Sequence, residues 1–198
     1  FIRQKKGAKI KFAAVNKRGE VEIDEIKKLI NSKTKIIAVT HISNVTGAIL
    51  PIKKIVDLAK DKKIPVLVDG TQGAPHLKID IQELGCDFYA ISCQKMYGPK
   101  GLGILYAKKK WLEELPPYQG GGGMISEVLK DKVSFADTPT KFEAGTMQTA
   151  DVVAFSESIN VMEELGIKNI QSHEKEILQY GIEKLKKNNS VNIIGEPQ

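Results

Sequence analysis

Short apolar runs alternate with amphipathic segments along most of this chain. The runs at 35–40 and 65–69 have almost no polar residue inside them, which is typical of strands buried on both faces of a parallel sheet. The run at 101–107 follows a Gly98–Pro99 turn, and we predict that it lies antiparallel to the strand before it. The predicted strands span residues 10–15, 35–40, 65–69, 87–92, 101–107 and 191–194.

Helical periodicity fills the intervals between these strands. Asp24 is expected to cap the first helix, Pro51 to begin the second, and Gly85 to end the third. Four consecutive glycines, Gly120–Gly123, are expected to form a mobile loop. The predicted helices span residues 25–30, 51–62, 80–84, 149–165 and 167–188.

This alternation predicts the α/β fold class, with a mostly parallel sheet flanked by helices. The length of 198 residues suits one domain or two small ones, and 41% apolar with 27% charged residues excludes a disordered or collagen-like chain. No run approaches the roughly 18 apolar residues of a membrane span, so no membrane partner is expected. The amino end lacks an initiator Met and the apolar core of a signal peptide, so we expect a piece of a longer protein without an export signal.

The formal net charge of +6 comes almost entirely from lysine, because Arg3 and Arg18 are the only arginines. Nucleic-acid surfaces favour Arg, since its guanidinium makes paired contacts with phosphates and bases. Many of these lysines stand beside Glu or Asp, as they do on solvated helix faces. No nucleic-acid partner is therefore expected.

Cys86 and Cys93 are too few for a disulfide framework and lie in or beside apolar runs. This usage is typical of a reducing compartment, so we expect a cytoplasmic protein. The three histidines are far apart in the sequence and no C-x-x-C motif is present, so no metal site is expected.

Polar side chains follow three neighbouring predicted strands, at the sheet edge where α/β proteins bind ligands. Asn44 follows the first of these strands, Asp69–Gln72 the second and Ser92–Lys95 the third. A strand-end Asp alone is more often a cap or turn residue, and a Lys alone is usually just solvated. Together, with an amide and a hydroxyl beside them, they predict a binding site.

Lys95 and Asp69 have the chemistry that pyridoxal phosphate requires. A lysine amine forms a Schiff base with the aldehyde of this cofactor, and an aspartate pairs with its protonated ring nitrogen. The pyridinium charge favours an ionised Asp69, and desolvation makes the Lys95 amine nucleophilic near neutral pH.

Five motifs carry a resemblance to a known family. V-D-G-T-Q at 68–72 and S-C-Q-K-M-Y-G-P-K-G-L-G at 92–103 resemble the class V aminotransferase group of fold-type I pyridoxal phosphate enzymes. T-H-I-S-N-V-T-G at 40–47, G-G-G-G-M-I at 120–125 and K-F-E-A-G-T at 141–146 are similar to SufS-type (group II) cysteine desulfurases. The resemblance is collinear over nearly the whole chain and corresponds to roughly the middle half of such an enzyme.

The resemblance implies two parts. Residues 1–150 would be the central part of the pyridoxal phosphate-binding large domain, incomplete at its amino end. Residues 151–198 would be helices and a first strand that lead into a truncated carboxyl-terminal domain.

The resemblance also implies roles for individual residues. Lys95 would hold the cofactor as a Schiff base and, once substrate displaces it, transfer protons. Asp69 would pair with the pyridine nitrogen, and Gln72 would hydrogen-bond the phenolic oxygen. Ser92 and Gln94 would contact the phosphate.

Three further matches concern substrate and subunits. Asn44 would help to orient the carboxylate of the substrate, L-cysteine. Thr146 would reach the phosphate bound by a neighbouring subunit, which implies a homodimer, and a sulfur-acceptor protein would be a further partner. His76 matches a family histidine but would fit a structural loop residue equally well.

The chain departs from the family at Gln94, where the family usually has His. Gln can donate a hydrogen bond but carries no charge, so weaker phosphate binding is expected. Cys93 replaces a usual Gly and is not the sulfur-accepting cysteine, which in the family lies beyond Gln198, together with the substrate-binding arginine. The family's ring-stacking His and an early phosphate-binding Thr would precede Phe1.

The leading hypothesis is a fragment of a pyridoxal phosphate-dependent cysteine desulfurase. Its parent would convert L-cysteine to L-alanine and pass persulfide sulfur to a carrier for iron–sulfur cluster assembly. One alternative is a related class V enzyme, such as a selenocysteine lyase or an aminotransferase- or epimerase-like relative, and another is a non-catalytic truncated gene product. We expect the isolated chain to be inactive as a desulfurase.

Overall fold

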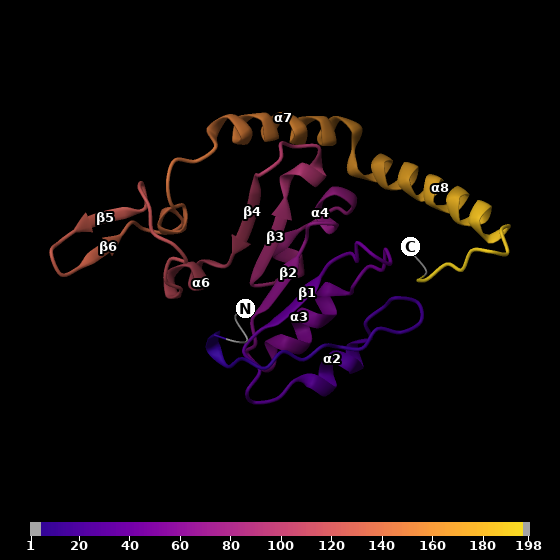
Figure 1. Cartoon of the computed structure of the whole chain (residues 1–198), viewed down its shortest axis with the longest axis horizontal. Coiled ribbons are helices and arrows are strands. Elements are labelled where there is room, and N and C mark those ends of the chain that lie inside the picture. The colour runs from indigo at the N-terminus through magenta and orange to yellow at the C-terminus, as the bar shows by residue number, and fades with distance from the viewer. Residues whose placement is uncertain (1–4, 196–198) are drawn as a thin grey trace.

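A four-stranded sheet forms the centre of the computed structural model, which describes residues 5–195. Strands β1 (Ile37–Thr40), β2 (Val66–Asp69) and β3 (Phe88–Ser92) run parallel, and β4 (Gly103–Ala107) lies antiparallel to β3. The strands are ordered β1-β2-β3-β4 across the sheet (Figure 1). The predicted α/β class, with a mostly parallel sheet flanked by helices, is confirmed.

Helix α3 packs against this sheet and supplies much of the core. Its Ile55 and Ala59 side chains are inaccessible to solvent and join Val66 and Val68 of β2 in one apolar cluster. Burial alternates along β2 instead of covering both faces, because inaccessible Val66 and Val68 alternate with half-buried Leu67. The helices near this core are α2 (Ile23–Leu29), α3 (Ile52–Lys60), α4 (Gly73–His76) and α5 (Ile81–Leu84).

The predicted end of α5 at Gly85 is confirmed, whereas the observed starts of α3 and α2 differ from the predicted ones. At α5, Asp80 accepts hydrogen bonds from the backbone amides of the first turn, and Gly85 ends the helix in the left-handed conformation with φ 69°. Pro51 occupies the cap position of α3, so this helix begins at Ile52, one residue after the predicted start. Asp24 does not cap α2, since that helix begins at Ile23 and Asp24 lies in its first turn.

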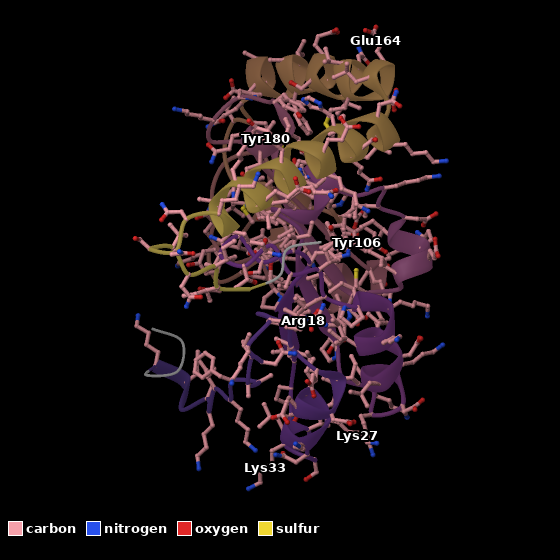
Figure 2. All side chains as sticks on the ribbon, turned by 90° about the vertical axis from the view of Figure 1, so that its right-hand side faces the viewer. Arg18, Lys27, Lys33, Tyr106, Glu164 and Tyr180 are labelled. Atoms are coloured by element: carbon pink, nitrogen blue, oxygen red, sulfur yellow. The ribbon has the colours of Figure 1, made fainter. Side chains whose placement is uncertain are left out.

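Two long helices lie along one edge of the molecule. Helices α7 (Thr149–Leu165) and α8 (Ile167–Lys186) match their predicted starts and run end to end above the sheet (Figure 1). The labelled Glu164 on α7 lies at the opposite end of the molecule from Lys27 and Lys33 (Figure 2). Within residues 5–195, no helix combines the length and apolar character that crossing a bilayer requires.

Two predicted strands are wrong. Residues 10–15 and 191–194 are irregular, with Phe12 83% and Ile194 79% exposed. Both segments are apolar enough to predict strands, but neither pairs with another strand in the part of the chain that the structure describes. A strand needs a neighbour for its backbone groups, which composition alone does not supply.

Several short elements had no sequence prediction. Strands β5 and β6 form an antiparallel hairpin that projects from the body of the molecule (Figure 1). Every residue of β5 is exposed, so the hairpin lacks the buried face that produces a recognisable alternation. These elements are α4, α6 (Lys109–Glu114), β5 (Ile125–Val128), β6 (Val133–Phe135) and the 3₁₀ turns η1 (Cys93–Met96) and η2 (Thr140–Phe142).

A buried carboxylate, Asp87, joins the start of β2 to the segment after β4. It accepts hydrogen bonds from the Val66 amide at 3.0 Å and the Trp111 indole at 2.9 Å, and the ammonium group of Lys108 lies 3.3 Å away. Burial by itself would raise the pKa of Asp87, but the hydrogen bonds from Trp111 and Val66 and the charge of Lys108 outweigh burial and lower it.

We predict that Asp87→Asn lowers the free energy of unfolding by roughly 1–3 kcal/mol at pH 7, because an amide group must leave one buried donor without an acceptor. The folded pKa of Asp87 lies below its unfolded value. The stability difference between wild type and variant is therefore complete above the unfolded pKa and shrinks as the pH falls below about 4. Urea denaturation at several pH values measures it.

The matched control is Asp57→Asn, which removes an exposed partner of Lys53 on α3 and should change stability little. Equal effects of the two substitutions would contradict a special role for the Asp87 network.

Candidate active site at the carboxyl ends of β1, β2 and β3

The parallel register brings three strand ends to one edge of the sheet. Thr40 of β1 pairs with Asp69, and Asp69 pairs with Ala90 of β3. The hydrogen bonding continues past the strands, since the His41 amide donates to the Asp69 carbonyl and the Gly70 amide to the Ala90 carbonyl, both at 2.8 Å. The three loops singled out in the sequence therefore leave the sheet side by side.

The loop after β2 places a carboxylate and an amide at this edge. The Asp69 side chain is exposed, and its Oδ1 accepts a hydrogen bond from the Thr71 amide at 3.0 Å. Gln72 is half-buried and immediately precedes α4, which starts at Gly73. This tight turn holds Asp69 and Gln72 within one short, hydrogen-bonded segment.

The loop after β3 carries the amine. Ser92 ends the strand, and η1 then places Gln94 and Lys95 at the surface, where both are exposed. Tyr97 ends η1 in the left-handed conformation, with φ 61°. Lys95 lies five residues beyond Ala90. Ala90 is on β3, the strand that pairs with Asp69 of β2.

Helix α7 fixes this loop from above. A Cβ on Gly98 would come within 2.6 Å of Phe155 Cδ2 and 2.8 Å of the Cys93 carbonyl oxygen, so only glycine fits between the two elements. The Ser158 hydroxyl donates a hydrogen bond to the Tyr97 carbonyl at 3.2 Å. The position of η1 thus depends on α7, far along the chain.

The loop after β1 presents Asn44 to solvent. Ser43 Oγ accepts hydrogen bonds from the amides of Val45 and Thr46, at 3.3 and 3.1 Å, which closes the loop around Asn44. The Asn44 side chain is exposed at the tip of this turn.

Thr146 follows no strand of the four-stranded sheet. It is exposed on the segment between η2 and α7, and within residues 5–195 no hydrogen bond joins it to the strand-end residues. Gly145 beside it donates to the Gly122 carbonyl at 2.8 Å, which ties the segment to the predicted glycine loop.

His76 ends α4 and is bound to α8. Its Nδ1 donates to the Glu174 carboxylate at 2.9 Å, and Gln171 Nε2 donates to the His76 carbonyl at 2.8 Å. The interpretation of His76 as a structural residue therefore has support in these contacts. They join α8 to the short helix that follows Gln72.

A buried ring pair below the site had no sequence prediction. His41 and Tyr89 are both buried, and His41 Nδ1 lies 2.9 Å from the Tyr89 hydroxyl. The sequence indicates Tyr89 only as a strand residue and His41 only as one residue of a polar loop. The signals in the sequence are Gly70 and Gly73, where the structure leaves no room for a side chain beside these rings.

Neither cysteine is available as a nucleophile. Cys86 and Cys93 are both free and fully buried, and burial raises the pKa of each thiol. A thiol must ionise and be accessible to attack, so both remain inert at neutral pH.

The residues at this edge fit pyridoxal phosphate by their chemistry. They supply a primary amine for an aldehyde, a carboxylate for a ring nitrogen, and amide and hydroxyl groups for a phenolic oxygen and a phosphate. All except Thr146 leave the sheet at the same edge. Lys95, Asp69, Gln72, Ser92 and Gln94 are therefore the residues that could hold such a cofactor.

Comparison with known proteins decides the family. The model of the class-V aminotransferase family matches residues 1–198. The chain belongs to the class-V aminotransferase family. A probable cysteine desulfurase from Halalkalibacterium halodurans is 41% identical over 189 residues, covering 96% of this chain and 47% of the relative. A cysteine desulfurase from Yersinia pseudotuberculosis is 42% identical over 196 residues, covering 98% of this chain and 48% of the relative.

Solved structures of cysteine desulfurases agree with this assignment. One from Escherichia coli superimposes with a TM-score of 0.91 at 34% identity, covering 94% of this chain and 47% of the other. The apo structure of one from Thermococcus onnurineus NA1 gives a TM-score of 0.88 at 29% identity, covering 94% and 46%. The chain spans about half the length of the curated relatives it matches.

Proposed function

We propose that this chain is the cofactor-holding portion of a pyridoxal phosphate-dependent cysteine desulfurase. The observation that carries the proposal is the placement of Lys95 and Asp69 beyond neighbouring parallel strands, β3 and β2, at one edge of the sheet. Membership of the class-V aminotransferase family supports the cofactor, and the two cysteine desulfurases at 41–42% identity support the substrate.

When bound, the cofactor acts as an electron sink that weakens bonds at the α-carbon of an amino acid. In the proposal, the Lys95 amine holds it covalently and, when substrate takes its place, carries a proton to and from the reacting carbon. The Asp69 carboxylate keeps the ring nitrogen protonated, and the Gln72 amide donates to the phenolic oxygen. Ser92 and Gln94 bind the phosphate.

The remaining parts of the proposal concern substrate and partners. Asn44, exposed at the tip of its loop, orients the carboxylate of L-cysteine. Thr146 is exposed, and it would contact the phosphate of a second copy in a homodimer. The parent would be a cytoplasmic SufS-type (group II) enzyme that yields L-alanine and delivers persulfide sulfur to an acceptor protein for iron–sulfur cluster assembly.

We also propose that the chain alone is inactive as a desulfurase. Sulfur must leave L-cysteine for an accessible thiolate, and both Cys86 and Cys93 are buried. The uncharged Gln94 further weakens the phosphate site, which keeps a non-catalytic truncated product as the second candidate. We expect almost no L-alanine release from L-cysteine by this chain.

The proposal predicts that borohydride reduction in the presence of pyridoxal 5′-phosphate fixes one label on Lys95. Peptide mapping by mass spectrometry locates it. Lys95→Ala should abolish the label, whereas Lys100→Ala, five residues further on and also exposed, should leave it unchanged. A label spread over the surface lysines, or one that persists in Lys95→Ala, would remove the assignment of Lys95.

A second prediction concerns Gln94→His. A protonated imidazole adds a charge-assisted hydrogen bond to the phosphate, so cofactor affinity should rise several-fold. The gain should grow as the pH falls through about 6.5, the ordinary pKa of histidine, because the added charge is present only below it. Absorbance titrations at pH 6 and pH 8 measure it, and equal affinities of variant and wild type at pH 6 would place Gln94 away from the phosphate.

A further inference from the structure

We propose that Tyr89 and His41 are positioning residues for the cofactor site, because their buried ring pair supports the turn that carries Asp69 and Gln72. The inference rests on the proposed function for its meaning in catalysis. It assigns a role to two side chains that none of the cofactor contacts above uses.

The turn after β2 lies directly on the two rings. A Cβ on Gly70 would overlap the ring carbons and hydroxyl of Tyr89. A Cβ on Gly73 would come within 2.9 Å of His41 Nδ1 and of the Tyr89 hydroxyl. With glycine at both positions, no side chain separates the turn from the rings, so the rings determine how closely the turn approaches the sheet.

The two rings are joined by a hydrogen bond, and both are neutral at pH 7. His41 Nδ1 lies 2.9 Å from the Tyr89 hydroxyl, and the rings meet edge to face with centroids 5.9 Å apart. Burial raises the pKa of Tyr89, as do the nearby Cys86 and Asp69, and burial lowers the pKa of His41. Tyr89 thus keeps its proton and His41 stays neutral, so the hydrogen bond joins two uncharged rings.

The same two chain segments hold the backbone of the turn. The His41 amide donates to the Asp69 carbonyl, and the Gly70 amide donates to the Ala90 carbonyl beside Tyr89. The pair therefore connects the end of β1 to β3 across β2, with Asp69 between them. Losing the Tyr89 hydroxyl should let His41 and the turn move together.

A role confined to filling the core gives a different expectation. In that case Tyr89→Phe would leave the turn and its cofactor contacts unchanged, because the ring remains. In a positioning role the same substitution loosens the turn, although only one oxygen atom is lost.

The test compares Tyr89→Phe with Tyr106→Phe, its neighbour across the β3–β4 pair. Tyr106 lies near the middle of the molecule (Figure 2), and within residues 5–195 its hydroxyl makes no hydrogen bond. We expect Tyr89→Phe to speed hydrogen exchange at the Gly70 and Ala74 amides and to weaken pyridoxal 5′-phosphate binding, each about 3–10-fold. It should also shift the visible absorption maximum of the bound cofactor. Tyr106→Phe should change none of these.

Unchanged exchange at Gly70 and Ala74 in Tyr89→Phe would overturn the inference. The exchange measurement needs no cofactor, so it decides the positioning role by itself. Failure of the unsubstituted chain to bind pyridoxal 5′-phosphate would instead overturn the proposed function, and the two failures are distinguishable.

A second pair of variants tests the packing directly. Gly70→Ala should weaken cofactor binding more than tenfold or prevent folding, because its methyl group meets the Tyr89 ring. Adding Tyr89→Leu opens space and should restore folded protein with faster exchange at Ala74. No recovery in the double variant would contradict direct support of the turn by the ring.

Discussion

The parallel register of β1, β2 and β3 determines where every candidate site residue except Thr146 lies. Because Thr40, Asp69 and Ala90 stand in one row across the sheet, the loops that follow them start together. Backbone hydrogen bonds extend this row by one residue, through His41 and Gly70. A shift of β2 by one residue in its pairing with β1 and β3 would turn Asp69 toward the other face of the sheet. Successive side chains of a strand point to opposite faces.

Helices α7 and α8, far along the chain, hold in place the loops that the strand register brings together. Helix α7 holds η1 through Phe155 and Ser158, and α8 holds α4 through Glu174. The loops with Lys95 and Gln72 are therefore each fixed by a segment more than fifty residues further along the chain. If these loops hold the cofactor as proposed, cofactor binding would be coupled to the docking of α7 and α8, because these helices hold both loops.

Much of the fold follows from local pattern. Buried apolar runs identified β1, β2 and β3 within one or two residues, and α7 and α8 began at the predicted residues. Residues 10–15 and 191–194 have the same apolar character but stay irregular, since pairing depends on a neighbour that the local sequence does not specify. The β5–β6 hairpin was missed for the opposite reason, because it pairs without burying a face.

The candidate site was predictable where residues follow strands and unpredictable where they meet across the fold. Asp69 and Lys95 stand beside apolar runs, so their common edge followed from the fold class. Their roles followed from the chemistry of an amine and a carboxylate together with the family resemblance. His41 and Tyr89 are 48 residues apart, and nothing in either local sequence indicates their contact. The sequence carries a trace of this contact only in Gly70 and Gly73, two positions where a side chain has no room.

In the proposed function, Lys95 and Asp69 bind opposite parts of one cofactor ring. A crystal structure of this chain soaked with pyridoxal 5′-phosphate tests it most directly. We predict electron density that is continuous from Lys95 Nζ to the cofactor, with an Asp69 oxygen within hydrogen-bond distance of the ring nitrogen. Cofactor bound to another lysine, or Asp69 turned away from the ring nitrogen, would contradict it.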